Sequence, residues 1–151
     1  MSIAPIRRSV LVQQSPARAF DLFVNRMAQW WPPHAHMSDE SFAEIVVEPQ
    51  VEGRWYQRNA DGSEHEWGRV LHWAPPSRLL LAWQIDASWK YDASFETTLE
   101  LRFEAEGSGT RVELEHRNLE RFGDSAERMA TQLGGGWPNI IARYAELANT
   151  N

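Results

Sequence analysis

A chain of 151 residues with a formal net charge of −6 has the size of one domain, and its charge disfavours nucleic acids and anionic membrane surfaces, which are bound through basic patches. The absence of cysteine excludes disulfides, thiolate metal ligands and a cysteine nucleophile. No apolar run approaches the ~20 residues of a membrane span and residues 1–12 lack the apolar stretch of a signal peptide, so we expect one cytoplasmic domain over residues 1–151.

The first predicted elements are a strand and a short helix. Residues 6–13 mix β-branched and polar side chains, which is typical of a strand. Ser15 and Pro16 follow, an N-cap hydroxyl and the proline favoured at the first helical position. Pro32 and Pro33 end the helical segment. Its buried face is predicted to consist of Phe20, Phe23, Val24 and Met27.

From Glu44 to Arg117 the apolar residues recur with period two, which predicts a meander of antiparallel strands. Turn signals lie at 52–53, 61–62, 75–76 and 107–109. Because strands do not alternate with helices, a parallel sheet is disfavoured. Over residues 79–85, 95–104 and 111–117 the inward face is predicted to hold Leu79, Leu81, Trp83, Ile85, Phe95, Thr97, Leu99, Leu101, Phe103, Val112, Leu114 and His116.

For the strand predicted over residues 64–73, the sequence does not decide which side chains face inward. One parity places His65, Trp67, Arg69, Leu71 and Trp73 on the inward face. Val70, on the opposite parity, is also apolar.

Residues 125–148 predict one long amphipathic helix. Gly134 to Gly136 and Pro138 fall in its middle, where each glycine costs ~1 kcal/mol relative to alanine and an interior proline ~3 kcal/mol. We therefore expect a kink or break at 134–138, with the sheet or a ligand passing close to the glycine backbone.

Short motifs spread in order over nearly the whole chain resemble the activator of heat-shock protein 90 ATPase homologue-like family. That family lies within the superfamily of START lipid-transfer domains, polyketide cyclases and the birch-pollen allergen. The motifs are Ser15 to Phe20, Trp30-Trp31, Glu52 to Trp55, Gly68 to Leu79 leading into Trp83, Gly109 to Val112, His116 and Gly135 to Pro138.

The resemblance implies an α+β helix-grip fold. In this fold an antiparallel sheet of about seven strands wraps around a long C-terminal helix, and two short helices close one end. Family members commonly hold a cavity between that helix and the sheet that a ligand can enter.

The eight tryptophans indicate either ordinary core filling or the lining of a small-molecule pocket. Trp89, in the polar stretch 86–94, is a candidate lid residue, and Arg69 and Tyr56 are candidate polar groups. On the implied fold, the candidate ligand-binding residues are Trp30, Trp31, Trp55, Trp67, Trp83, Leu99, His116, Gly135 and Trp137.

His116 admits two interpretations, a hydrogen-bonded structural residue or a polar contact to a ligand. In the second case it could also exchange a proton with a carbonyl or phenol. His34, His36 and Asp39 resemble a metal site only in that two histidines share one side of an extended chain, so we expect neither metal nor cofactor. The sequence also lacks a phosphate-binding glycine loop and a nucleophile elbow.

The leading functional hypothesis is a non-catalytic protein that binds a small apolar or aromatic molecule. One alternative is an enzyme of the polyketide cyclase type that uses His116. Another is a chaperone-interacting module, which we expect less because the chain lacks the separate N-terminal domain with which the eukaryotic co-chaperone grips its chaperone. A homodimer is compatible with exposed strand edges and surplus tryptophans.

Overall fold

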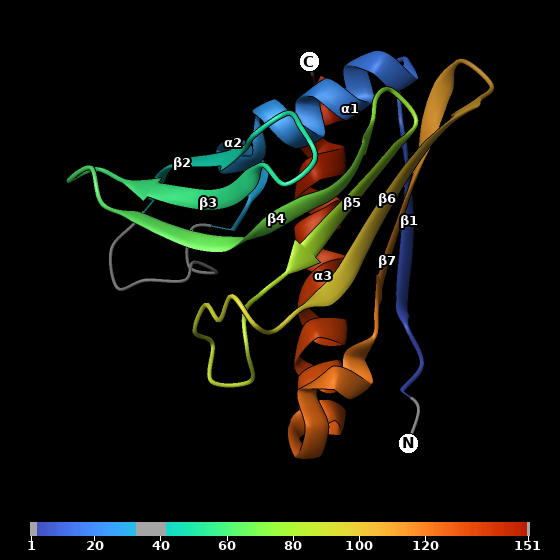
Figure 1. The fold of residues 1–151 in the computed structure, drawn as a ribbon. Helices are drawn as coiled ribbons and strands as arrows, with labels where there is room; N and C mark the ends of the chain where they lie inside the picture. Colours follow the sequence, from blue (N-terminus) through green and yellow to red (C-terminus); the bar gives the residue numbers. More distant parts are fainter. Residues whose placement is uncertain (1–2, 33–41, 151) are drawn as a thin grey trace.

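The computed structural model describes residues 3–32 and 42–150. An antiparallel sheet curls around one long helix, and two short helices lie at one end (Figure 1). The strands are β1 (Ile6–Val12), β2 (Phe42–Val47), β3 (Arg54–Asn59), β4 (Glu64–Ala74), β5 (Arg78–Trp83), β6 (Thr97–Glu106) and β7 (Gly109–Arg117). The helices are α1 (Pro16–Asn25), α2 (Met27–Trp30), the 3-10 helix η1 (Leu119–Ser125) and α3 (Ala126–Thr150).

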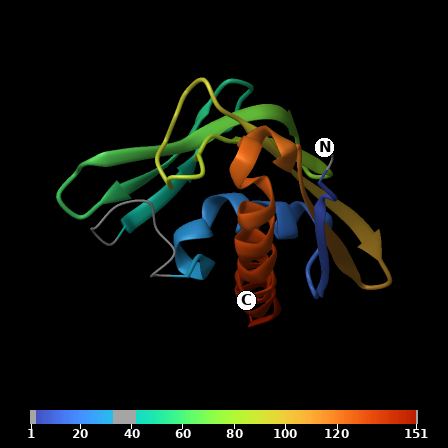
Figure 2. The same ribbon diagram turned by 90° about the horizontal axis from the view of Figure 1, so that it is seen from below.

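The sheet has seven strands in the order β1-β7-β6-β5-β4-β3-β2. All its neighbouring strands are antiparallel, and β2 to β7 follow one another as a meander. A long crossover joins the two edge strands β1 and β2, and α1 and α2 lie in it. Seen along α3, the sheet arches over the helix (Figure 2). The predicted α+β helix-grip fold is confirmed.

α1 begins and packs as the sequence predicts. The Ser15 hydroxyl accepts a hydrogen bond from the Arg18 backbone N–H at 3.2 Å, and Pro16 occupies the first helical position. Phe20, Phe23 and Val24 are buried against the core, and so is Met27. Met27 begins α2, because the helix predicted to run to Pro32 is divided at Arg26.

The alternation predicted for β5, β6 and β7 is also confirmed, since the apolar parity of each strand is buried. Phe95 is the exception, because it precedes β6 and packs on Phe122 with ring centroids 4.9 Å apart. Glu100 lies on the outer face of β6, yet its side chain is only 7% exposed. Arg78 and Arg117 cover it, with ion-pair distances of 2.7 and 2.6 Å.

The predicted inward face of β4 is wrong in part. The register shifts once between β3 and β4 and once between β4 and β5, so the simple period of two fails along this strand. Trp67 and Val70 are therefore both buried, whereas His65 is exposed and Arg69 is ion-paired with Glu96 at 2.9 Å. Between the two shifts a Cβ on Gly68 would collide with the Ala82 carbonyl oxygen, so only glycine fits there.

α3 corrects a second prediction, because it runs from Ala126 to Thr150 as one helix without a break at 134–138. Nor is the space beside the three glycines occupied: outside the helix's own backbone, a Cβ on Gly134, Gly135 or Gly136 would meet no atom within 4 Å. Pro138 cannot donate to the carbonyl of Gly134, four residues earlier. The Arg8 guanidinium donates to that oxygen instead, at 3.4 Å, which helps the helix to continue.

Candidate functional site

Five indoles meet between the concave face of the sheet and α3, and we refer to them as the tryptophan cluster. None is more than 2% exposed. The contacts close into a ring that runs from Trp31 to Trp67, Trp55, Trp83, Trp137 and back to Trp31. Centroids of neighbouring indoles lie 5.0 to 6.0 Å apart, and most pairs are edge to face, the favourable geometry for aromatic contacts.

Local structure explains why these side chains converge. Trp55, Trp67 and Trp83 come from the inner face of β3, β4 and β5, which are neighbours in the sheet. Trp137 lies on the buried stripe of α3, and Trp31 directly follows α2. Three neighbouring strands, the long helix and the end of a short helix thus each supply part of the ring.

His116 of β7 is held at both ring nitrogens. The Trp137 indole N–H donates to His116 Nδ1 at 3.1 Å, which assigns the proton of the neutral ring to Nε2. Nε2 then donates to Thr97 Oγ1 at 2.8 Å, and the Thr97 hydroxyl lies 3.5 Å from the Trp83 carbonyl oxygen. Burial lowers the pKa of His116 to about 3, so the ring is neutral at pH 7. A neutral ring bonded on both sides is suited to positioning Trp137 rather than to donating a proton.

A second polar chain starts at Trp67. Its indole N–H donates to Gln57 Oε1 at 3.1 Å, and the Gln57 amide donates to Asn59 Oδ1 at 2.8 Å. Both amide residues are buried on the inner face of β3. Sequence reasoning missed them, although the alternation of Trp55, Gln57 and Asn59 was the available signal. It also placed Thr97 inward without assigning its bond to His116.

Two indoles of the cluster have no such partner. Across the described part of the chain, the N–H groups of Trp55 and Trp83 reach no hydrogen-bond acceptor, although both atoms are fully buried. A buried donor without an acceptor costs ~1–3 kcal/mol. These two N–H groups are therefore the unsatisfied polar atoms of the tryptophan cluster.

The other predicted site residues lie in different places. Leu99 is fully buried and pairs in register with His116, whereas Trp30 contacts Phe23 and Tyr144 on the far side of Trp31. Gly135 is exposed on α3 and does not face the tryptophan cluster.

The candidate polar and lid residues also lie apart from the cluster. Tyr56 lies on the outer face of β3, where its hydroxyl accepts a bond from Arg58 at 2.9 Å. Trp89 is 39% exposed in the loop between β5 and β6.

His34, His36 and Asp39 fall outside the described residues. Within 3–32 and 42–150, no three His, Asp or Glu side chains are grouped so as to hold a metal ion. None of the helices described is long and apolar enough to cross a membrane.

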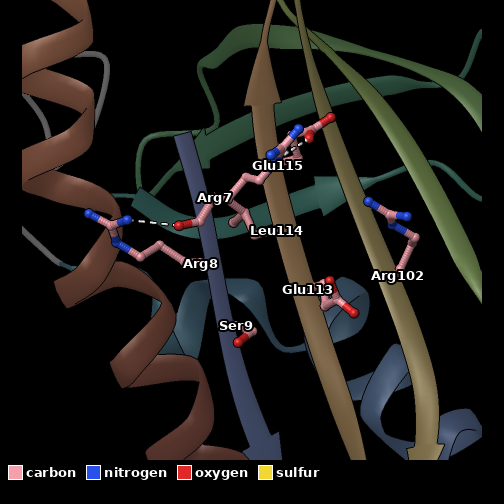
Figure 3. Close-up of a pocket in the computed structure, with 7 residues that line it drawn as sticks. All are labelled: Arg7, Arg8, Ser9, Arg102, Glu113, Leu114 and Glu115. Carbon is pink, nitrogen blue, oxygen red and sulfur yellow. Dashed lines mark hydrogen bonds and ion pairs between the residues drawn. The ribbon is translucent and has the colours of Figure 1, made fainter. Parts of the chain in front are cut away.

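A hollow of about 160 Å³ on the sheet near β1 and β7 has the opposite character to the cluster (Figure 3). Arg7 lies over β7 and pairs with Glu115 at 2.6 Å, while Arg8 extends toward α3. Arg102 and Glu113 complete a rim of mixed charge. This hollow is polar and does not suit an apolar ligand.

Comparisons with known proteins agree with this fold. The model of the family described as Activator of Hsp90 ATPase homolog 1-like protein matches residues 13–149. Among solved structures, the anthrahydroquino-gamma-pyrone synthase Txn09, complexed with SUM, is 40% identical, with 96% of this chain and 97% of that chain covered and a TM-score of 0.67. No curated protein matches.

Two further solved structures are similar at lower identity. CalC, a self-sacrificing resistance protein from Micromonospora echinospora, is 25% identical over 97% of this chain and 94% of that chain, with a TM-score of 0.73. The Aha1 dimer from Colwellia psychrerythraea is 14% identical over 97% of each chain, with a TM-score of 0.67, which shows a shared fold alone.

Proposed function

The chain belongs to the Activator of Hsp90 ATPase homolog 1-like family, and we propose that it binds a flat, fused-ring aromatic molecule between the concave face of the sheet and α3. The observation that carries the proposal is the closed ring of five buried indoles. Aromatic contacts contribute ~0.5–1.5 kcal/mol per pair beyond area burial, so a flat guest can exchange indole–indole contacts for indole–guest contacts.

The comparisons support an aromatic guest. The synthase that is 40% identical over almost the full length of both chains is named for a fused anthrahydroquinone and pyrone ring system. Its similarity to this chain extends over the strands and the helix that carry the tryptophan cluster. A guest of the same ring type is therefore the first to test.

Entry of a guest requires local separation of α3 from the sheet, since the cluster is closed to solvent. The helix is intrinsically weakest at Gly134 to Gly136, where each glycine costs ~1 kcal/mol relative to alanine. Trp137 follows this stretch directly. We infer that bending at the three glycines moves Trp137 away from Trp83 and admits the guest.

A fluorescence titration tests the proposal. Anthraquinone-2-sulfonate should quench the tryptophan emission with saturation at one molecule per chain. Trp89→Phe removes a surface indole and Arg102→Ala removes a cation from the polar hollow, and neither should change the dissociation constant more than twofold. Unsaturable quenching, or quenching that either variant abolishes, would refute binding at the tryptophan cluster.

A second candidate function is ring closure on the bound aromatic, favoured by the 40% identity to a synthase. In this case His116 positions Trp137, because both of its nitrogens are already hydrogen-bonded. Mass spectrometry and chromatography would follow an anthrahydroquinone that carries a 1,3-diketone side chain next to a phenol. Ring closure forms the bond from the phenol oxygen to the distal carbonyl carbon and releases one water, so the product is lighter by the mass of one water. Conversion to a pyrone no faster than in buffer would eliminate this candidate.

A further inference from the structure

We propose that Trp55 and Trp83 donate hydrogen bonds from their unpaired indole N–H groups to a carbonyl oxygen of the aromatic guest. This inference rests on the proposed function and specifies its ligand as a quinone- or pyrone-type molecule rather than a plain hydrocarbon. The two residues lie on β3 and β5, the strands on either side of β4, and their ring centroids are 5.9 Å apart.

Other buried indoles in this core donate to acceptors within the chain. Trp137 donates to His116, Trp67 donates to Gln57, and Trp30 donates to the Leu22 carbonyl at 3.2 Å. The large majority of buried side-chain donors in folded proteins are paired. The presence of two unpaired N–H groups in the same ring of five indoles therefore requires a specific reason.

Core packing does not supply that reason. Phenylalanine or leucine could fill the inner face of β3 and β5 without a buried polar atom, whereas each unpaired indole N–H carries a desolvation cost. The side-chain acceptors that serve the other indoles of the cluster are already bonded: His116 Nδ1 accepts from Trp137, and Gln57 Oε1 accepts from Trp67. No described residue accepts a bond from Trp55 or Trp83, and a guest that enters the ring of indoles brings an acceptor.

The chemistry of the donors defines the guest. An indole N–H donates and cannot accept, so the matching group is a carbonyl or phenolate oxygen. Both donors are neutral and surrounded by aromatic carbon, which suits a conjugated ketone. A guest without oxygen would leave both N–H groups unsatisfied, and a site built to bond an oxygen rejects such an analogue.

A matched pair of probes tests the inference. Anthraquinone-2-sulfonate and anthracene-2-sulfonate share the fused rings and the sulfonate and differ in the two ring carbonyls. The wild-type chain should bind the quinone at least tenfold more tightly. Trp55→Phe and Trp83→Phe should each reduce that preference by three- to tenfold. Trp30→Phe, which removes a buried indole outside the ring whose N–H is bonded to the Leu22 carbonyl, should preserve the preference.

The outcomes separate the two proposals. If neither probe binds, the proposed function fails, and the inference fails with it. If both probes bind with equal affinity, or if the preference is unchanged in Trp55→Phe and Trp83→Phe, the function stands and the inference is overturned.

A second measurement requires no variant to fold. In the wild-type chain labelled with 15N-tryptophan, the indole N–H resonances of Trp55 and Trp83 should shift downfield with the quinone and not with the anthracene. Resonances that stay in place with bound quinone would show that these N–H groups face aromatic rings instead.

Discussion

Trp137 donates its indole N–H to Nδ1 of His116 at 3.1 Å, and this buried bond ties the centre of α3 to β7. The same indole closes the ring of five tryptophans, with Trp83 on one side and Trp31 on the other. One residue thus connects the packing of the long helix with the candidate ligand site.

Replacing Trp137 with phenylalanine should lower the free energy of unfolding. The variant keeps an aromatic ring but leaves His116 Nδ1 without a donor, which costs ~1–3 kcal/mol in addition to the loss of ring volume. Trp83→Phe is the matched control, because its N–H has no acceptor to lose. Urea unfolding should show Trp137→Phe to be the less stable of the two. Equal losses would mean that the bond to His116 contributes nothing.

Stability should depend on pH through His116. Its pKa is about 3 in the folded chain, against an ordinary value of 6.5 in the unfolded chain. Above pH 6.5 both states are neutral and the full stability is present. As the pH falls below 6.5, the unfolded state takes up a proton that the folded state does not, and stability falls until the pH passes the folded pKa.

Between pH 7.5 and 5.0 this predicts a loss of about 2 kcal/mol, at ~1.4 kcal/mol per pH unit below 6.5. His116→Asn removes the titrating ring and should flatten the dependence over this range. Urea unfolding at five pH values measures both slopes. Parallel slopes for the two proteins would be incompatible with a buried neutral histidine.

Alanine at Gly135 should stabilise the chain by about 0.5–1 kcal/mol. The position is exposed in α3, and a Cβ there would meet nothing within 4 Å outside the helix's own backbone. Alanine therefore has a higher helix propensity than glycine at this position and causes no steric clash. If the three glycines admit the guest by bending, the same change should slow association of anthraquinone-2-sulfonate. Thermal unfolding and stopped-flow fluorescence measure the two effects. A destabilised variant would contradict the open space around Gly135, and an unchanged association rate would contradict bending.

Arg8 and Pro138 should be energetically coupled through the Gly134 carbonyl. Arg8→Ala removes the guanidinium that donates to this oxygen, and we expect a loss of about 0.5–1.5 kcal/mol. In a Pro138→Ala background the restored backbone N–H of residue 138 can bond to the same oxygen. Arg8→Ala should then cost less. A double-mutant cycle by urea unfolding measures the coupling, and strict additivity would show that Arg8 does not compensate for the proline.

Regular periodicity made most of the fold predictable. The face of α1 that contains Phe20 and the inward position of His116 follow from helical spacing and strand alternation. The parity of β4 did not follow, because two register shifts interrupt it and no local residue pattern signals both. The unbroken α3 was missed because Arg8, over 120 residues away, supplies the bond that Pro138 removes.

The residues that face the site were largely predictable from the sequence, but their hydrogen-bond partners were not. Sequence parity places Trp83 and His116 on the inner face, but hydrogen-bond partners depend on how the strands and α3 come together. Which indole N–H groups are paired, as in Trp67, and which are unpaired, as in Trp55, becomes visible only in three dimensions.

The most direct test of the ligand site is a crystal structure of the chain with anthraquinone-2-sulfonate. We predict electron density for the fused rings between the sheet and α3, in contact with Trp83 and Trp137. Density only in the hollow beside Arg7 and Arg102, or beside Trp89, with the ring of indoles still closed, would contradict it.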